Sequence, residues 1–139
     1  MRIDFYILQT ETDRELFACR LIEKAFQQGV RTCVRTSDAR QAARMDDKLW
    51  TFRPGSFIPH ELGNASAEIL NKVPVVIAWT AVEGDFELCI NLHHGVLDDY
   101  AQFARLAEII PADPESKALG RQRFAFYREQ AVELHHHEV

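Results

Sequence analysis

The sequence predicts an α/β fold: a single three-layer α/β/α domain built on a mainly parallel sheet. Between residues 3 and 50, two short apolar segments alternate with two amphipathic segments, which is the order of a right-handed βαβ unit. Further apolar segments and a long amphipathic one follow in the second half. The chain has 139 residues, the size of one ordinary domain. We therefore expect one domain over residues 1–139, with a frayed tail at 134–139.

Each element of the first half is predicted from its hydrophobic period and from the residues that begin or end it. Thr12 and Glu15 have the spacing of a capping box, and Gly29 stands where a helix ends. Ser37 or Asp38 caps the second helix. The expected elements are a strand at 3–8, a helix at 12–28, a strand at 30–36, a helix from 38 to about 50 and an irregular segment at 51–63.

The second half is predicted to continue with strands and a long last helix. Residues 73–79 and 86–92 form apolar strands, and the short connection between them favours an antiparallel pair, which would make the sheet mixed. Asp113 caps the last helix, with Pro114 in its first turn. The other expected elements are a helical turn at 64–71, a helix at 98–108, a short strand at 109–110 and the last helix from 114 to about 133.

Composition and charge argue against several function classes. The 16 Lys and Arg residues against 21 Asp and Glu residues give a net charge of −5, which does not suit a protein held to duplex DNA or anionic lipid by a general positive field. No segment approaches the ~20 apolar residues of a membrane helix, and the N-terminal residues lack the layout of a signal peptide. Three cysteines without a CxxC motif are typical of reduced thiols, so we expect a cytoplasmic protein that does not contact a membrane.

Motifs that would carry catalysis or bind a cofactor are absent. The turn after the first strand reads QTETDRE, with carboxylates in place of the glycines that let a dinucleotide approach, and neither GxxxxGK[ST] nor GxSxG occurs. His93 and His94 are the best candidates for a metal or acid/base site, because they follow a strand end, where the sites of α/β proteins gather. Neighbouring residues on a strand point to opposite faces, however, which argues against both histidines binding one ion. We therefore predict a Rossmann-like fold without a nucleotide-binding loop, and no catalytic residue, cofactor or metal. His135–His137 are read as part of the polar tail.

The last helix carries a stripe of positive charge, although the protein is acidic overall. The stripe consists of Lys117, Arg121, Phe124 and Arg128. Their spacing of i, i+4, i+7 and i+11 places them on one helix face, with Leu119 and Phe126 on the opposite side as expected core contacts. Three cations around an aromatic ring suit a short acidic segment that ends in an apolar residue. A solvated helix face is the alternative.

The segment after the second helix is rich in aromatic residues and prolines. Its apolar residues are Trp50, Phe52, Phe57 and Ile58, beside Pro54, Pro59 and His60. Such a segment either folds back over the core or exposes an aromatic anchor to a partner.

Both stretches resemble those of a known family. Residues 46–63, DDKLWTFRPGSFIPHELG, resemble the pattern around the tryptophan and the S-F-[IV]-P-H element of the chi subunit of bacterial DNA polymerase III holoenzyme. Residues 111–130, PADPESKALGRQRFAFYREQ, are similar to that family's last helix. The resemblance covers essentially the whole chain.

The resemblance implies a non-catalytic accessory subunit of DNA replication, located in the bacterial cytoplasm at the replisome. Chi subunits pair with the psi subunit of the clamp loader and bind the acidic, phenylalanine-ended tail of single-stranded DNA-binding protein. They also associate with a repair helicase through the surface that psi uses. Carried over to this sequence, the tail site comprises Ile110, Lys117, Arg121 and Phe124, to which helix geometry adds Arg128. The psi or helicase surface comprises Trp50, Phe57 and Pro59, to which adjacency adds His60. Family members can carry tyrosine at the position of Phe124, so a hydroxyl contact there would be lost.

Two other functions remain open from the sequence. One is a small nucleotide-binding or enzymatic doubly wound domain, which would need polar residues that converge at the strand ends. The other is direct binding of single-stranded DNA by the last helix, whereas the resemblance implies that contact with nucleic acid is mainly indirect.

Overall fold

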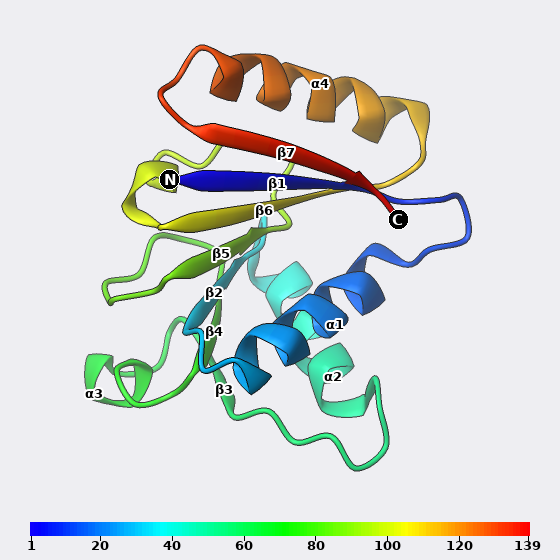
Figure 1. Cartoon of the computed structure of the whole chain (residues 1–139). Coiled ribbons are helices and arrows are strands. Elements are labelled where there is room, and N and C mark those ends of the chain that lie inside the picture. Colours follow the sequence, from blue (N-terminus) through cyan, green and yellow to red (C-terminus); the bar gives the residue numbers. More distant parts are fainter.

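The structure, a computed structural model that describes residues 1–139, is one parallel sheet with helices on both faces (Figure 1). The strands are β1 (Arg2–Ile7), β2 (Thr32–Arg35), β3 (His60–Leu62), β4 (Val75–Ala78), β5 (Leu88–Asn91), β6 (Arg105–Ile110) and β7 (Glu133–Glu138). The helices are α1 (Arg14–Gln27), α2 (Ala39–Thr51), α3 (Ala67–Leu70) and α4 (Pro114–Arg128), with a 3₁₀ helix η1 at Tyr100–Gln102. The strand order is β3-β4-β2-β5-β6-β1-β7. The predicted three-layer α/β/α fold is confirmed.

Two apolar cores lie on opposite faces of the sheet. α1 and α2 cover one face, where Ile22 and Met45 are fully buried against the strands. α3, η1 and α4 cover the other face, where Phe103 and Tyr127 are buried. The central strands β2, β4 and β5 are buried along their whole length, as strands covered on both faces must be. All three cysteines lie in these cores as free thiols, and none of the helices could span a membrane.

The starts of α2 and α4 and the end of α1 lie where the sequence predicts them. Asp38 begins α2 and Asp113 begins α4, each by accepting a hydrogen bond from a backbone N–H of the first turn. Gly29, just after α1, has a φ angle of 71°, which glycine adopts without strain. The start of α1 differs from the prediction, because Asp13 rather than Thr12 accepts the capping hydrogen bonds.

The sheet differs from the prediction in its connections. β4 and β5 are not antiparallel neighbours: they lie on either side of β2 and run parallel to it, so the sheet is not mixed. Residues 98–108 do not form a helix, since only η1 is helical there and β6 follows it. Every residue from Leu106 to Ile110 is buried, which suits a strand covered on both faces, whereas an amphipathic helix exposes one face. β3 forms within the segment expected to be irregular.

The C-terminal segment is a strand rather than a frayed tail. α4 ends at Arg128 instead of continuing to residue 133, and β7 pairs with β1 at the sheet edge opposite to β3. The histidines of the tail therefore lie within a strand. A short polar strand at an edge has no hydrophobic period of its own, and its pairing with β1 could not be read from the sequence.

The buried face of α4 is also not the predicted one. Phe126 is 41% exposed, and Leu119 is half-buried. The residues that face the sheet are Gly120, Arg123 and Tyr127. Arg123 is a charged residue in the middle of this buried face, and it interrupts the pattern of apolar residues from which a buried helix face is predicted.

Candidate functional site

A buried polar network ties α4 to the sheet. The Glu108 side chain of β6 is fully buried and accepts hydrogen bonds from Arg123 Nε at 3.0 Å and from the Tyr127 hydroxyl at 2.7 Å. Asn91 of β5 donates to the same carboxylate. Burial raises the pKa of Glu108, and the Arg123 charge and the hydrogen bonds offset part of that rise. The network thereby fixes the position of α4 above β5 and β6.

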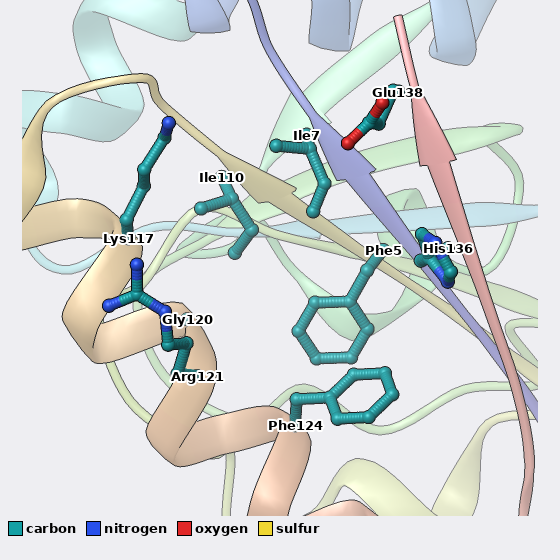
Figure 2. Close-up of a pocket in the computed structure, with 9 residues that line it drawn as sticks. All are labelled: Phe5, Ile7, Ile110, Lys117, Gly120, Arg121, Phe124, His136 and Glu138. Carbon is teal, nitrogen blue, oxygen red and sulfur yellow. The ribbon is translucent and has the colours of Figure 1, made fainter.

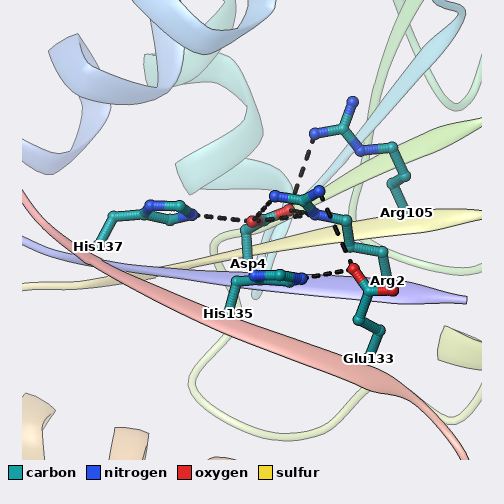
Figure 3. A network of polar contacts seen from close by, with 6 residues as sticks. All are labelled: Arg2, Asp4, Arg105, Glu133, His135 and His137. Carbon is teal, nitrogen blue, oxygen red and sulfur yellow. Dashed lines mark hydrogen bonds and ion pairs between the residues drawn. The ribbon is translucent and has the colours of Figure 1, made fainter.

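A second polar network holds β7 on β1 (Figure 3). The Asp4 side chain of β1 is 4% exposed, and its Oδ1 atom lies 3.0 Å from Arg2 Nη2 and 2.8 Å from His137 Nε2. Arg105 Nη2 lies 3.7 Å from the other carboxylate oxygen. Burial by itself raises the pKa of Asp4, but the hydrogen bonds from Arg2 and His137 and the nearby arginine charges bring it below its usual value. Asp4 therefore anchors β7 as an ionised carboxylate.

A pocket of about 280 Å³ lies between α4 and the strands that these networks position (Figure 2). We call it the α4 pocket. Its lining residues are Phe5 and Ile7 of β1, Ile110 of β6, Lys117, Gly120, Arg121 and Phe124 of α4, and His136 and Glu138 of β7.

The floor of the α4 pocket is apolar. Phe5 and Ile110 are almost completely buried, and the Phe5 and Phe124 rings meet edge to face with centroids 5.2 Å apart. Gly120 lets α4 approach β6, because a Cβ atom there would lie 2.9 Å from Ile110 Cδ1. The floor can therefore receive an apolar group as large as a phenyl ring.

The rim of the α4 pocket on the helix side is positively charged. Lys117 and Arg121 are exposed, and neither takes part in an ion pair within the chain. Both cations are thus free to bind carboxylates of a ligand. Glu138 contributes a carboxylate on the β7 side. An apolar floor beside two free cations suits an acidic segment that ends in a large apolar residue.

The structure brings together four of the five residues expected at the tail site. They are Ile110, Lys117, Arg121 and Phe124, which all line the α4 pocket. Arg128 does not line it, because it is the last residue of α4, beyond the pocket. The sequence did not predict the other lining residues, Phe5, Ile7, Gly120, His136 and Glu138. Gly120 could have been found from the sequence, because a glycine within a helix costs about 1 kcal/mol relative to alanine. Such a glycine often marks a place where the helix packs closely against a neighbouring element.

The aromatic residues in the last turn of α2 and in the segment after it show both arrangements that the sequence allowed. Ile58 and His60 fold back and are buried. Trp50 and Phe57 are 44% and 66% exposed, and their ring centroids lie 5.5 Å apart. The His60 ring packs against the Trp50 ring, with centroids 4.3 Å apart, and His60 Nε2 is hydrogen-bonded to the Asp46 carboxylate of α2. Pro59 is half-buried. We call Trp50 and Phe57 the aromatic surface.

The two adjacent histidines after β5 do not point to opposite faces as expected. They lie in a bend after β5 rather than on the strand, and the ring centroids of His93 and His94 are 4.3 Å apart. His93 Nδ1 lies 3.1 Å from the Ser37 hydroxyl, and burial lowers the pKa of His93. No group of three or more His, Cys, Asp or Glu side chains gathers in a way that could hold a metal ion.

The chain matches the family model described as DNA polymerase III chi subunit, HolC, over residues 1–135. It is 35% identical to the DNA polymerase III subunit chi of Pseudomonas aeruginosa over 141 aligned positions, which cover 99% of this chain and 96% of that protein. The subunit chi of Haemophilus influenzae is 28% identical, covering 94% and 92%, and that of Escherichia coli is 27% identical, covering 89% and 88%. These matches confirm the family resemblance and span most of every chain. The protein therefore belongs to the family of DNA polymerase III chi subunits.

Proposed function

We propose that this DNA polymerase III subunit holds the acidic, phenylalanine-ended C-terminal tail of single-stranded DNA-binding protein in the α4 pocket. The observation that supports the proposal is an apolar pocket with Lys117 and Arg121 unpaired at its rim. The terminal phenyl ring of the tail packs on the floor beside Phe124, and the tail carboxylates pair with the two cations. Contact with DNA is then indirect, which agrees with a net charge of −5.

Charge and ring packing make different contributions to this binding. The two rim cations attract the acidic tail and raise the association rate, which falls with added salt. The buried phenyl ring sets much of the residence time. Because Phe124 has no hydroxyl group, this contact rests on packing rather than on a hydrogen bond.

A peptide titration tests the proposal. Arg121→Ala is expected to weaken binding of a synthetic acidic peptide ending in Phe by about 1–3 kcal/mol, roughly five- to 150-fold, because a charge-assisted contact is lost. Arg40→Ala is the matched control, since Arg40 is exposed on α2, far from the pocket lining, and its loss changes the net charge equally. Equal affinities for the wild type and Arg121→Ala, measured by fluorescence anisotropy, would exclude the α4 pocket as the tail site.

We further propose that the subunit is an accessory without catalytic activity, which joins a clamp-loader psi subunit, or a repair helicase, through the aromatic surface. Two neighbouring exposed aromatic side chains, Trp50 and Phe57, support this assignment, since large aromatic residues dominate binding hot spots. The His60 ring packs against Trp50, and half-buried Pro59 belongs to the segment that carries Phe57. The protein would then act in the bacterial cytoplasm at the replisome.

The two alternative functions have simple tests. A nucleotide-binding domain would be stabilised against heat by one member of a nucleotide panel, and we expect no such shift. Direct DNA binding would give tight association with a bare single-stranded oligonucleotide at physiological salt. We expect that association to be weak, and to become strong when the tailed single-stranded DNA-binding protein coats the oligonucleotide.

A further inference from the structure

We propose that the acidic peptide in the α4 pocket also pairs its backbone with the free edge of β7, as an added strand of the sheet. This inference rests on the proposed function of the α4 pocket, and it adds the mode of recognition. The backbone pairing fixes the register of the peptide, while the pocket receives its terminal side chain.

β7 is a strand with one open edge. It is the last strand of the sheet and pairs with β1 alone. The N–H groups of Glu133 and Val139 donate to carbonyl groups on the β1 side. Because successive N–H groups of a strand point to opposite sides, those of Leu134, His136 and Glu138 point away from β1 and are available to a further strand.

The open edge is continuous with the α4 pocket. His136 and Glu138 line the pocket, and their N–H groups belong to the open edge. A strand added there lies about 4.8 Å beyond β7, and every second side chain of it points to the face that α4 covers. The terminal residue of such a strand can enter the pocket, and its acidic residues can approach Lys117 and Arg121.

Side-chain contacts with β1 hold β7 in position as the edge strand. His137 is bonded to buried Asp4, and its ring stacks on Tyr6 with centroids 5.0 Å apart. β7 is therefore held as a strand before any peptide arrives, which reduces the ordering cost of binding.

An acidic peptide is a better occupant of this edge than a second copy of the chain. Antiparallel pairing of two β7 edges centred on His136 would bring Glu138 opposite Leu134 and His136 opposite its own copy, so it would form no favourable charge pair between opposed residues. The carboxylates of an acidic peptide can instead form ion pairs with Lys117 and Arg121 of α4. Self-association through β7, seen by analytical ultracentrifugation of the wild type and abolished in His136→Pro, would overturn the proposal.

The first experiment acts on the peptide. An acidic peptide ending in Phe, about eight residues long, is N-methylated at one backbone amide at a time, and each form is titrated against the full chain. We expect alternation: methylation of every second amide weakens binding about five- to tenfold, and methylation of the amides between leaves it nearly unchanged. Tight binding of the unmethylated peptide without alternation overturns the added strand and leaves the pocket assignment intact. Failure of the unmethylated peptide to bind overturns both.

The second experiment acts on the protein. His136→Pro removes an N–H group that points away from β1, so the ladder with β1 is kept, whereas His136→Ala removes the same side chain and keeps the N–H group. We expect His136→Pro to bind about five- to tenfold more weakly than His136→Ala, with hydrogen exchange of the β1 amides unchanged. Equal affinities of the two variants would contradict the proposal, and the peptide series decides the matter if His136→Pro loosens β7.

Discussion

Gly120 of α4 lies directly against Ile110 of β6, so closely that a Cβ atom on Gly120 would meet the Ile110 side chain at three atoms, the nearest 2.9 Å away. Both residues also line the α4 pocket. The height of α4 above the sheet and the depth of the pocket therefore depend on the same contact.

We expect Gly120→Val to reduce both stability and peptide binding. The branched side chain must displace Ile110, which costs about 1–3 kcal/mol in the free energy of unfolding and moves Ile110 into the pocket. Ala118→Val is the control, because Ala118 is exposed on the same helix. Urea denaturation and the peptide titration measure the two effects, and wild-type affinity in Gly120→Val would show that the pocket floor is not used.

We expect Glu138→Gln to strengthen peptide binding. Glu138 brings a carboxylate to the lining of the α4 pocket, where it repels the acidic residues of the peptide. Its neutralisation should raise affinity about two- to fivefold, the scale of an exposed charge pair, and the gain should shrink at high salt. Glu87→Gln, at an exposed position outside the pocket, should have no effect. Weaker binding by Glu138→Gln would mean that this carboxylate contacts the peptide through hydrogen bonds instead.

We expect Phe57→Ala to keep the fold and to lose a protein partner. The Phe57 side chain is 66% exposed, so its truncation should change the free energy of unfolding by only about 0.5 kcal/mol. Loss of a hot-spot ring should weaken psi or helicase binding by about 2 kcal/mol or more, measured by co-purification and titration. Ile69→Ala, at an exposed apolar residue of α3, is the control. If Phe57→Ala unfolds, the aromatic surface is part of the core rather than an anchor.

We expect the stabilising effect of Asp4 to disappear in acid. The pKa of Asp4 is lowered in the folded protein from its usual 3.8, so its contribution is complete above that value and is lost as the pH falls through the lower folded value. Asp4→Asn should cost about 1.5–3 kcal/mol at pH 7, as expected for hydrogen bonds to a charged group, and less near pH 3. Urea denaturation at pH 7, 5 and 3 tests this, with exposed Asp85→Asn as the control. A cost that does not shrink with acid would mean that Asp4 is not ionised.

Most buried strands and two of the helix caps could be predicted because the signal is local. The apolar runs that became β2, β4 and β5 are buried along their whole length, the run that became β1 is buried at its centre, and Asp113 with Pro114 marks the start of α4. The segment that became β6 could not be assigned correctly, because an apolar run beside polar residues fits a helix as well as a strand until its neighbours are known.

The candidate site also has a part that local sequence patterns predict and a part that only long-range contacts determine. The spacing of Lys117, Arg121 and Phe124 on one helix face follows from the helical repeat alone, and so the sequence by itself determined the charged side of the α4 pocket. The tertiary structure decided the rest: which face of α4 is buried through Arg123 and Glu108, and that the histidine-rich end is β7 rather than a tail. The physical reason is distance along the chain. The contact between Asp4 and His137 joins residues separated by 133 positions, and no local period carries information about such a pairing.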